Sequence, residues 1–151
     1  MSGVSVRIQL LDARLGKEIP LPVRMSEHAA GYDVAAAVEK ATTLAPGARL
    51  LVPCGFAMSV PLGFEVQVRP RSGLAVKHGI GVLNSPGTID ADYRGEVRVI
   101  LVNLGNLPLT IEPGMRIAQL VVAPVVPSSF EVVAELDDTM RGKGGFGSTG
   151  L

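Results

Sequence analysis

The stretch "GFEVQVRP" at residues 63–70 determines the class of fold. Apolar and polar side chains alternate along it with a period of two, as Phe64, Val66 and Val68 against Glu65, Gln67 and Arg69. This alternation is typical of a β-strand with one buried face and one solvated face.

Similar apolar, β-branched runs recur on both sides of this stretch and are separated by turn signals. The runs are "VSVRIQLL" (4–11), "RLLVPCGFAMSV" (49–60), "GEVRVILVNL" (95–104) and "LTIEPGMRIAQLVVAPVV" (109–126). Proline and glycine cluster between runs at 46–47 and 61–63, and a further turn signal divides the last run at 112–114. The pattern predicts an all-β sandwich or barrel-like domain.

One segment, "RSGLAVKHGI" at 71–80, departs from the strand pattern and predicts a short helix. Ser72 is a suitable N-cap and Gly79 a suitable C-terminal glycine. Arg71 and the free N–H groups of a helix start would then favour an anion such as phosphate. An ordinary capped helix with an exposed arginine is the alternative.

Composition limits the functions that are possible. The 151 residues include 14 basic and 14 acidic side chains, so the formal net charge is zero. Broad nucleic-acid or membrane binding usually needs excess Lys and Arg, and we expect neither. The single cysteine, Cys54, is expected to be a buried apolar residue. With no long apolar run at the N-terminus, a soluble cytoplasmic protein is expected.

The last stretch, "RGKGGFGSTGL" at 141–151, contains the pattern G-x-G-x-x-G. A dinucleotide fold or P-loop needs a helix after the glycines, and the P-loop lysine is also missing, so both interpretations are rejected. Glycines still allow backbone N–H groups to approach phosphate closely. We therefore predict a core over residues 1–140 and a flexible glycine-rich arm over residues 141–151, with a frayed solubilising tail as the alternative.

The stretch "LNSPGTIDADYRGEVRV" at 83–99 predicts a hairpin that carries two carboxylates, Asp90 and Asp92. A carboxylate that is already ionised is a weak base, so positioning of water and target would have to supply most of the rate. Asp92 is interpreted as a solvated turn residue. Gln119, in an otherwise apolar run, is expected at the surface or at a sheet edge.

Five segments in this order resemble the motifs of the trimeric deoxyuridine triphosphatases (dUTPases). They are "AGYDV" (30–34), "PRSGLAVKHGI" (70–80), "GTIDADYRGEV" (87–97), "RIAQLVV" (116–122) and "RGKGGFGSTG" (141–150). The resemblance implies a homotrimer of jelly-roll-like subunits with active sites at subunit interfaces. It implies hydrolysis of dUTP to dUMP and pyrophosphate with Mg²⁺, which limits uracil incorporation into DNA and supplies dUMP for thymidylate synthesis.

The resemblance also implies a role for each motif residue. Asp90 would activate the water that attacks the α-phosphorus, and Tyr93 would pack on the deoxyribose. The remaining nucleoside-binding positions would be Asn84, Gly87, Thr88, Ile89 and Arg98. Phosphate would be held by Arg71, Ser72, Gly73 and Gln119. Asp33 would support the metal's water shell from outside, and no direct protein ligand to Mg²⁺ is expected. The arm would close through Arg141 and Phe146, with Gly147, Ser148 and Thr149 on the outer phosphates.

Two alternatives remain open. A dCTP deaminase resembles the chain around "RSG" and "GTID", but that family typically lacks a tyrosine at position 93 and the glycine-rich arm. A catalytically silent trimeric β module would bind nucleotides or partner proteins without turnover.

Overall fold

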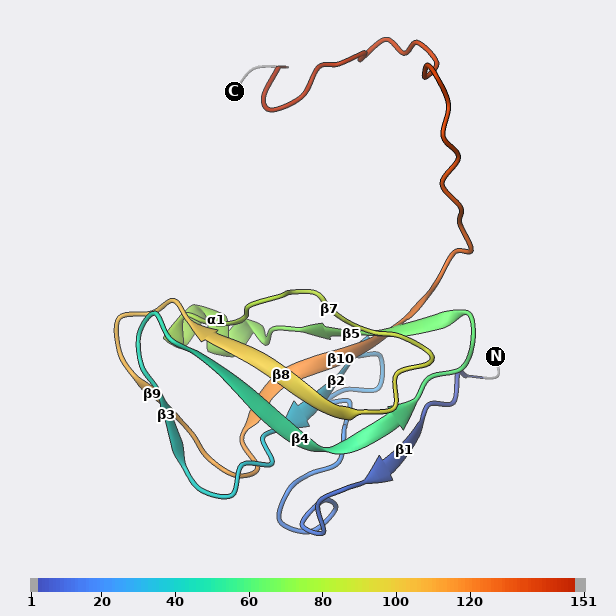
Figure 1. Ribbon diagram of the computed structural model, residues 1–151. Helices are drawn as coiled ribbons and strands as arrows, with labels where there is room; N and C mark the ends of the chain where they lie inside the picture. The colour runs from blue at the N-terminus through green and yellow to red at the C-terminus, as the bar shows by residue number, and fades with distance from the viewer. Residues whose placement is uncertain (1–2, 149–151) are drawn as a thin grey trace.

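The computed structural model describes residues 3–148 and shows two antiparallel β-sheets packed face to face (Figure 1). One sheet has the strand order β1-β4-β8-β6, the other β2-β10-β5-β7, and β3 and β9 form a separate two-stranded ribbon. The strands are β1 Arg7–Leu10, β2 Gly31–Ala35, β3 Thr42–Leu44, β4 Arg49–Ser59, β5 Phe64–Arg69, β6 Ile80–Val82, β7 Gly87–Ile89, β8 Glu96–Asn103, β9 Leu109–Ile111 and β10 Arg116–Pro124. A single short helix, α1 Ser72–His78, lies between β5 and β6 in the described chain.

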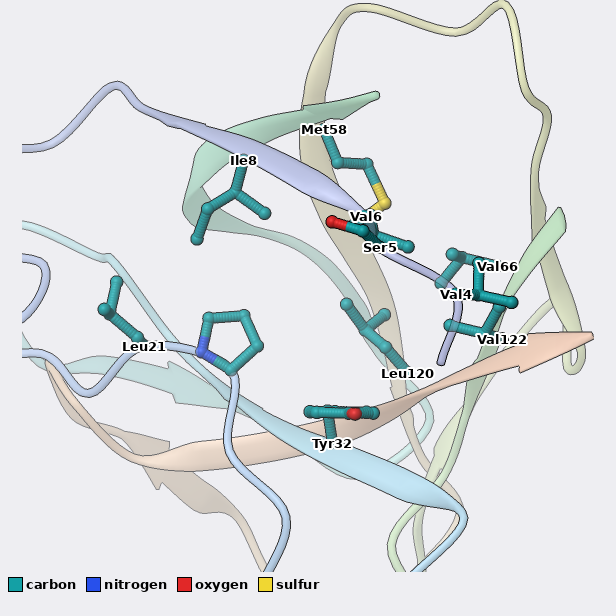
Figure 2. A pocket seen from close by; sticks show the side chains of 11 residues that line it. Val4, Ser5, Val6, Ile8, Leu21, Tyr32, Met58, Val66, Leu120 and Val122 are labelled. Carbon is teal, nitrogen blue, oxygen red and sulfur yellow. The ribbon is translucent and has the colours of Figure 1, made fainter. Parts of the chain in front are cut away.

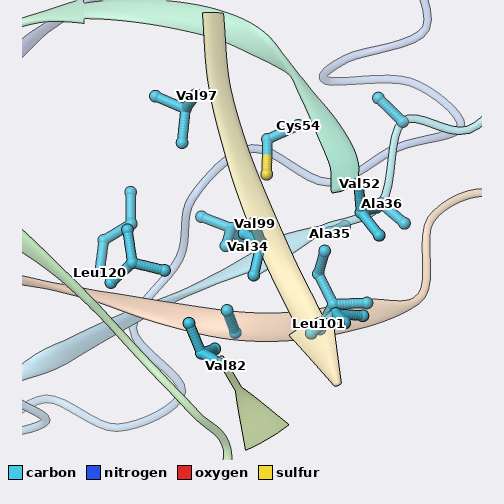
Figure 3. Close-up of a cluster of buried hydrophobic side chains, with 14 of the residues drawn as sticks. Val34, Ala35, Ala36, Val52, Cys54, Val82, Val97, Val99, Leu101 and Leu120 are labelled. Carbon is cyan, nitrogen blue, oxygen red and sulfur yellow. The ribbon is translucent and has the colours of Figure 1, made fainter. Parts of the chain in front are cut away.

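The hydrophobic core fills the space between the two sheets (Figure 3). Val34 of β2 and Leu120 of β10 face Val99 and Leu101 of β8, and all four are almost completely buried. Cys54 is 1% exposed, and this burial raises the pKa of its thiol to about 12. The sequence-based prediction of Cys54 as a buried apolar residue is confirmed.

The predicted all-β class with one helix is confirmed, and period two is a reliable guide to the core. In β5, Val66 and Val68 are buried whereas Arg69 is exposed. The predicted turns are also present, with Gly47, Gly63 and Gly114 at positive φ. The run 31–35 was not predicted as a strand, because its small residues give no clear alternation.

Three local predictions were wrong. Strands β7 and β8 do not form a hairpin: β7 pairs with β5, whereas β8 pairs with β4 and β6. Ser72 is not the N-cap: that position belongs to Arg71, without a side-chain cap, and Ser72 is the first helical residue. Gln119 was expected at the surface or at a sheet edge, and only the edge is wrong: β10 lies between β2 and β5, and Gln119 is half-buried there.

Strand structure ends at Pro124, and the following residues lie apart from both sheets (Figure 1). Val125 still donates a backbone hydrogen bond to the Gly63 carbonyl. Residues 126–143 are all exposed. No helix within the described residues is long and apolar enough to cross a membrane.

Candidate active site

A cavity of about 300 Å³ lies where β7 and β8, one from each sheet, come together. Its lining includes six residues predicted to bind the nucleoside, namely Asn84, Gly87, Thr88, Ile89, Tyr93 and Arg98. Val68, Val97 and Ile100 supply apolar walls. The cavity therefore combines apolar walls with a few polar groups, as a site for a small organic ligand requires.

Strand β7 is fixed against β5, and this pairing shapes the cavity. Gly87 lies opposite Val68, and a Cβ added at Gly87 would come within 3.2 Å of the Val68 Cβ and 3.3 Å of the Asn84 amide nitrogen. A side chain at this position would therefore press on the wall of the cavity. Ile89 is buried beneath it, which anchors β7 in the core.

Glu96 connects three parts of the cavity region and was not predicted from the sequence. Its carboxylate accepts a hydrogen bond from the Gly55 backbone N–H at 3.1 Å and pairs with Arg98 at 3.0 Å. Its backbone carbonyl accepts the hydroxyl of Tyr93 at 3.1 Å. Glu96 thus joins the bulge of β4, where Gly55 has positive φ, to the strand that carries Arg98.

The two candidate carboxylates follow β7 directly. Asp90 comes next after the buried Ile89, and both Asp90 and Asp92 are exposed. The turn is closed by a hydrogen bond from the Tyr93 N–H to the Asp90 carbonyl at 3.2 Å. Asp90 therefore leaves the sheet beside the cavity, and its carboxylate is accessible to water.

A second group of predicted residues lies outside this cavity, where β2, β10 and the end of β5 meet. The Asp33 carboxylate pairs with the guanidinium of Arg71 at 3.1 Å and with that of Arg116 at 3.2 Å. Gln119 donates its side-chain N–H to the Pro70 carbonyl at 2.9 Å, next to Arg71. We call Asp33, Arg71, Arg116 and Gln119 the arginine cluster.

Helix α1 begins at this cluster. Ser72 and Gly73 form its first turn, and both are exposed. The first turn contains no acidic residue that would repel an anion, and the first N–H groups of a helix have no acceptor within the helix. Two cations and these N–H groups therefore favour phosphate at this end of β5.

The C-terminal residues contact neither group. Arg141 donates only within its own segment, to the Gly144 carbonyl at 2.9 Å, and Phe146 is fully exposed. Gly147 and Ser148 are also exposed, and Thr149 lies outside the described residues. The structure therefore places the predicted residues in three separate groups within one chain.

Another cavity, of about 410 Å³, opens beside β1 (Figure 2). Side chains from the N-terminal segment, β2, β4, β5 and β10 point into it, among them Ile8, Tyr32, Met58 and Leu120. Its lining residues carry no charge, and none of them is a predicted site residue. A cavity with this lining cannot neutralise the negative charge of a triphosphate.

Comparison with known proteins identifies the family. The family model for dUTPase matches residues 17–150. The chain belongs to the dUTPase family. A deoxyuridine 5'-triphosphate nucleotidohydrolase of Rickettsia prowazekii is 53% identical over 151 residues and 100% of both chains. One from Desulfotalea psychrophila is 56% identical over 93% of this chain and 94% of its own.

Solved structures agree with this assignment. The dUTPase of Staphylococcus bacteriophage 80alpha with dUPNHPP superposes with a TM-score of 0.81 at 28% identity, covering 97% of this chain and 99% of the phage chain. A point mutant of the same phage enzyme gives a TM-score of 0.82 at 26% identity, covering 95% and 98%. The predicted family, fold class and enzyme class are confirmed.

Proposed function

We propose that this member of the dUTPase family hydrolyses dUTP to dUMP and pyrophosphate at sites that three copies of the chain build together. The observation that carries the proposal is the cavity between β7 and β8, with Asp90 beside it. The arginine cluster and the C-terminal segment supply the phosphate-binding groups that this cavity lacks.

The cavity selects the nucleoside. The side-chain amide of Asn84 offers both a donor and an acceptor to the polar edge of uracil. The buried Ile89 and the close approach at Gly87 leave a narrow slot, which disfavours a 5-methyl group. Tyr93, held at its hydroxyl by the Glu96 carbonyl, would pack on the deoxyribose and leave no space for a 2′-hydroxyl.

Asp90 acts as the base. Its carboxylate takes a proton from a water molecule as the water oxygen attacks the α-phosphorus. A new P–O bond forms, the bond to the bridging oxygen of the β-phosphate breaks, and pyrophosphate leaves. Because an ionised carboxylate is a weak base, most of the acceleration comes from holding the water in line with the leaving group.

The arginine cluster fits a magnesium triphosphate. Asp33 offers a carboxylate, but its Oδ2 is already bound by two guanidinium groups, whose charge opposes direct approach of a divalent cation. A water molecule on Mg²⁺ is the better partner, since Mg²⁺ keeps several waters and prefers phosphate oxygens. When bound, Mg²⁺ would neutralise charge on the triphosphate. The triphosphate oxygens would be held by Arg71, Ser72, Gly73 and Gln119.

A homotrimer would bring the three groups together. The cavity, the arginine cluster and residues 141–148 are apart within one chain, so each site would take its phosphate ligands and its closing segment from other copies. Arg141 and Phe146 would then cover the nucleotide, with Gly147, Ser148 and Thr149 on the outer phosphates. The cytoplasmic location and the boundary at residue 141 remain predictions from the sequence.

The decisive test is pyrophosphate release from dUTP, dCTP, dTTP and UTP, with and without Mg²⁺. We expect turnover of dUTP alone, and ammonia release from dCTP would indicate a deaminase instead. Asp90→Asn should lower kcat by about 10³-fold or more while dUTP still binds, because removing a general base affects the chemical step.

Asp92→Asn is the matched control for Asp90→Asn. It removes an exposed carboxylate two residues away, on the same turn, and should leave kcat within about twofold. Equal losses of kcat in the two variants would show that Asp90 does not act as the general base. Near-normal turnover by Asp90→Asn would overturn the proposed mechanism.

A further inference from the structure

Arg116 is a residue of the arginine cluster to which the sequence pattern assigns no function. Its side chain is 40% exposed, and its Nη1 donates to Asp33 Oδ2 at 3.2 Å. Asp33 is far less accessible, at 12%, and the same oxygen pairs with Arg71 Nε at 3.1 Å. One carboxylate oxygen is therefore shared between two guanidinium groups.

An irregularity in β10 puts Arg116 on this face of the sheet. Gln119 lies opposite Asp33, and strict alternation from Gln119 would turn residue 116 towards the core. The register shifts between Arg116 and Ala118, however, so that Ile117 is an extra residue. Ile117 and Ala118 are consecutive and both buried, as a bulge requires. The bulge thereby places the side chain of Arg116 on the same face of the sheet as Asp33.

Arg71 is held at two of its three nitrogens by this arrangement. Its Nε pairs with Asp33, and its Nη1 donates to the backbone carbonyl of Arg116 at 3.1 Å. These contacts fix the plane of the guanidinium, and within the described chain Nη2 is left without a protein acceptor. A guanidinium held in this way loses little freedom when it binds phosphate.

We propose that Arg116 is a positioning residue, which holds Asp33 and thereby orients Arg71 for the triphosphate. The proposal rests on the proposed function, because it assumes that Arg71 binds phosphate. Two positive side chains around one carboxylate also leave a net positive charge for the ligand. Arg116 acts through Arg71 and does not itself need to touch the substrate.

The first test compares Arg116→Gln with the wild type in dUTP hydrolysis and in binding of dUMP and dUPNHPP by calorimetry. We expect KM for dUTP and Kd for dUPNHPP to rise about tenfold, kcat to stay within about threefold, and Kd for dUMP to change less than twofold. Equal weakening of dUMP and dUPNHPP would indicate general damage to the fold and overturn the proposal. So would an unchanged KM for dUTP.

The second test is a double-mutant cycle with Arg71→Gln. If Arg116 acts through Arg71, the double variant should bind dUPNHPP no more weakly than Arg71→Gln alone. A further tenfold loss in the double variant would show that Arg116 binds phosphate by itself, and would contradict a positioning role. The cycle therefore distinguishes an effect of Arg116 on the orientation of Arg71 from the simple loss of the positive charge of Arg116.

Arg116→Lys keeps the positive charge beside Asp33, and should bind dUPNHPP within about threefold of wild type. If Arg116→Gln does not fold, the same cycle is run with Arg116→Lys, whose smaller effect must vanish in the Arg71→Gln background. Arg49→Gln, an exposed arginine of β4, is the surface control. Wild-type protein that fails to release pyrophosphate from dUTP would refute the proposed function. Normal wild-type turnover, together with an Arg116→Gln variant whose KM and Kd match those of wild type, would refute only this inference.

Discussion

The cavity beside β7 and the segment 126–148 are proposed to serve one site, yet the chain holds them in opposite ways. Ile89 and Val97, at the cavity, are buried in the core, whereas Phe146 is fully exposed and belongs to a segment that lies apart from both sheets. Ordering a free segment costs about 1–2 kcal/mol of backbone entropy per residue, so it must be repaid by several contacts at once. A preformed cavity carries no such cost.

This difference indicates a division of labour. Core packing shapes the cavity before any nucleotide arrives, so we expect the choice of base and sugar to be made there. The C-terminal segment can add phosphate and stacking contacts only when the nucleotide is bound. Substitutions at the cavity should therefore change stability and specificity together. Substitutions in the C-terminal segment should change activity alone.

The strongest test of this separation is deletion of residues 141–151. We expect kcat/KM for dUTP to fall about 100-fold or more, because the phosphate and stacking contacts of the segment are lost together. Tm, followed by circular dichroism, should change by less than about 2 °C, because no core strand needs these residues. A truncated chain that no longer folds or assembles would show that the segment is structural.

A smaller loss is expected from Phe146→Ala. Base stacking on an aromatic ring contributes about 1–3 kcal/mol, so kcat/KM for dUTP should fall about tenfold without any change in Tm. Phe146→Tyr keeps the ring and is the matched control. Equal activity of the Ala and Tyr variants would exclude stacking by this side chain.

The cavity should respond differently to Gly87→Ala. The new methyl group would meet Val68 at 3.2 Å, so the pairing of β7 with β5 must adjust. We expect about 1 kcal/mol of lost stability, a Tm lower by about 2–4 °C, and a KM for dUTP raised about fivefold. Gly145→Ala, where a Cβ would meet nothing within 4 Å, should leave Tm unchanged. Similar Tm values for both variants would contradict the contrast between the packed cavity and the exposed C-terminal segment.

The least change is expected at Cys54. Burial raises the pKa of its thiol to about 12, so the thiol stays protonated at neutral pH and reacts slowly, since the thiolate is the nucleophile. Native protein at pH 8 should take up almost no maleimide, and urea-unfolded protein should take up one equivalent. Rapid labelling of the native form would show that the space between the sheets opens.

Much of the fold was predictable because buried and exposed residues alternate. The runs around β1, β4, β5, β8 and β10 were all recognised, and the predicted glycines between strands mark real turns. The segment Gly31–Ala35 was missed because Ala and Gly carry little periodic signal. The predicted hairpin was wrong because sequence proximity does not reveal that β7 and β8 pair with different partners.

The site divides in the same way. Motif residues such as Asp90, Arg71 and Phe146 could be proposed as site residues from the sequence, since their types and spacing are specific. Glu96 and Arg116 could not, because their importance lies in contacts with Gly55 and Asp33, far away along the chain. Two consecutive apolar residues, Ile117 and Ala118, were the only local sign of the bulge.

The sequence by itself determined the all-β class and the family, and it supplied the chemical types of the proposed site residues, because these depend on local periodicity and on motifs read in order. Only the tertiary structure decided that one carboxylate joins two arginines, that Gln119 lies on a central strand, and that the cavity forms between strands of two sheets. The place of Gln119 and the cavity follow from strand pairing. The shared carboxylate follows from a one-residue shift in register at Arg116, which reverses the face on which that side chain lies.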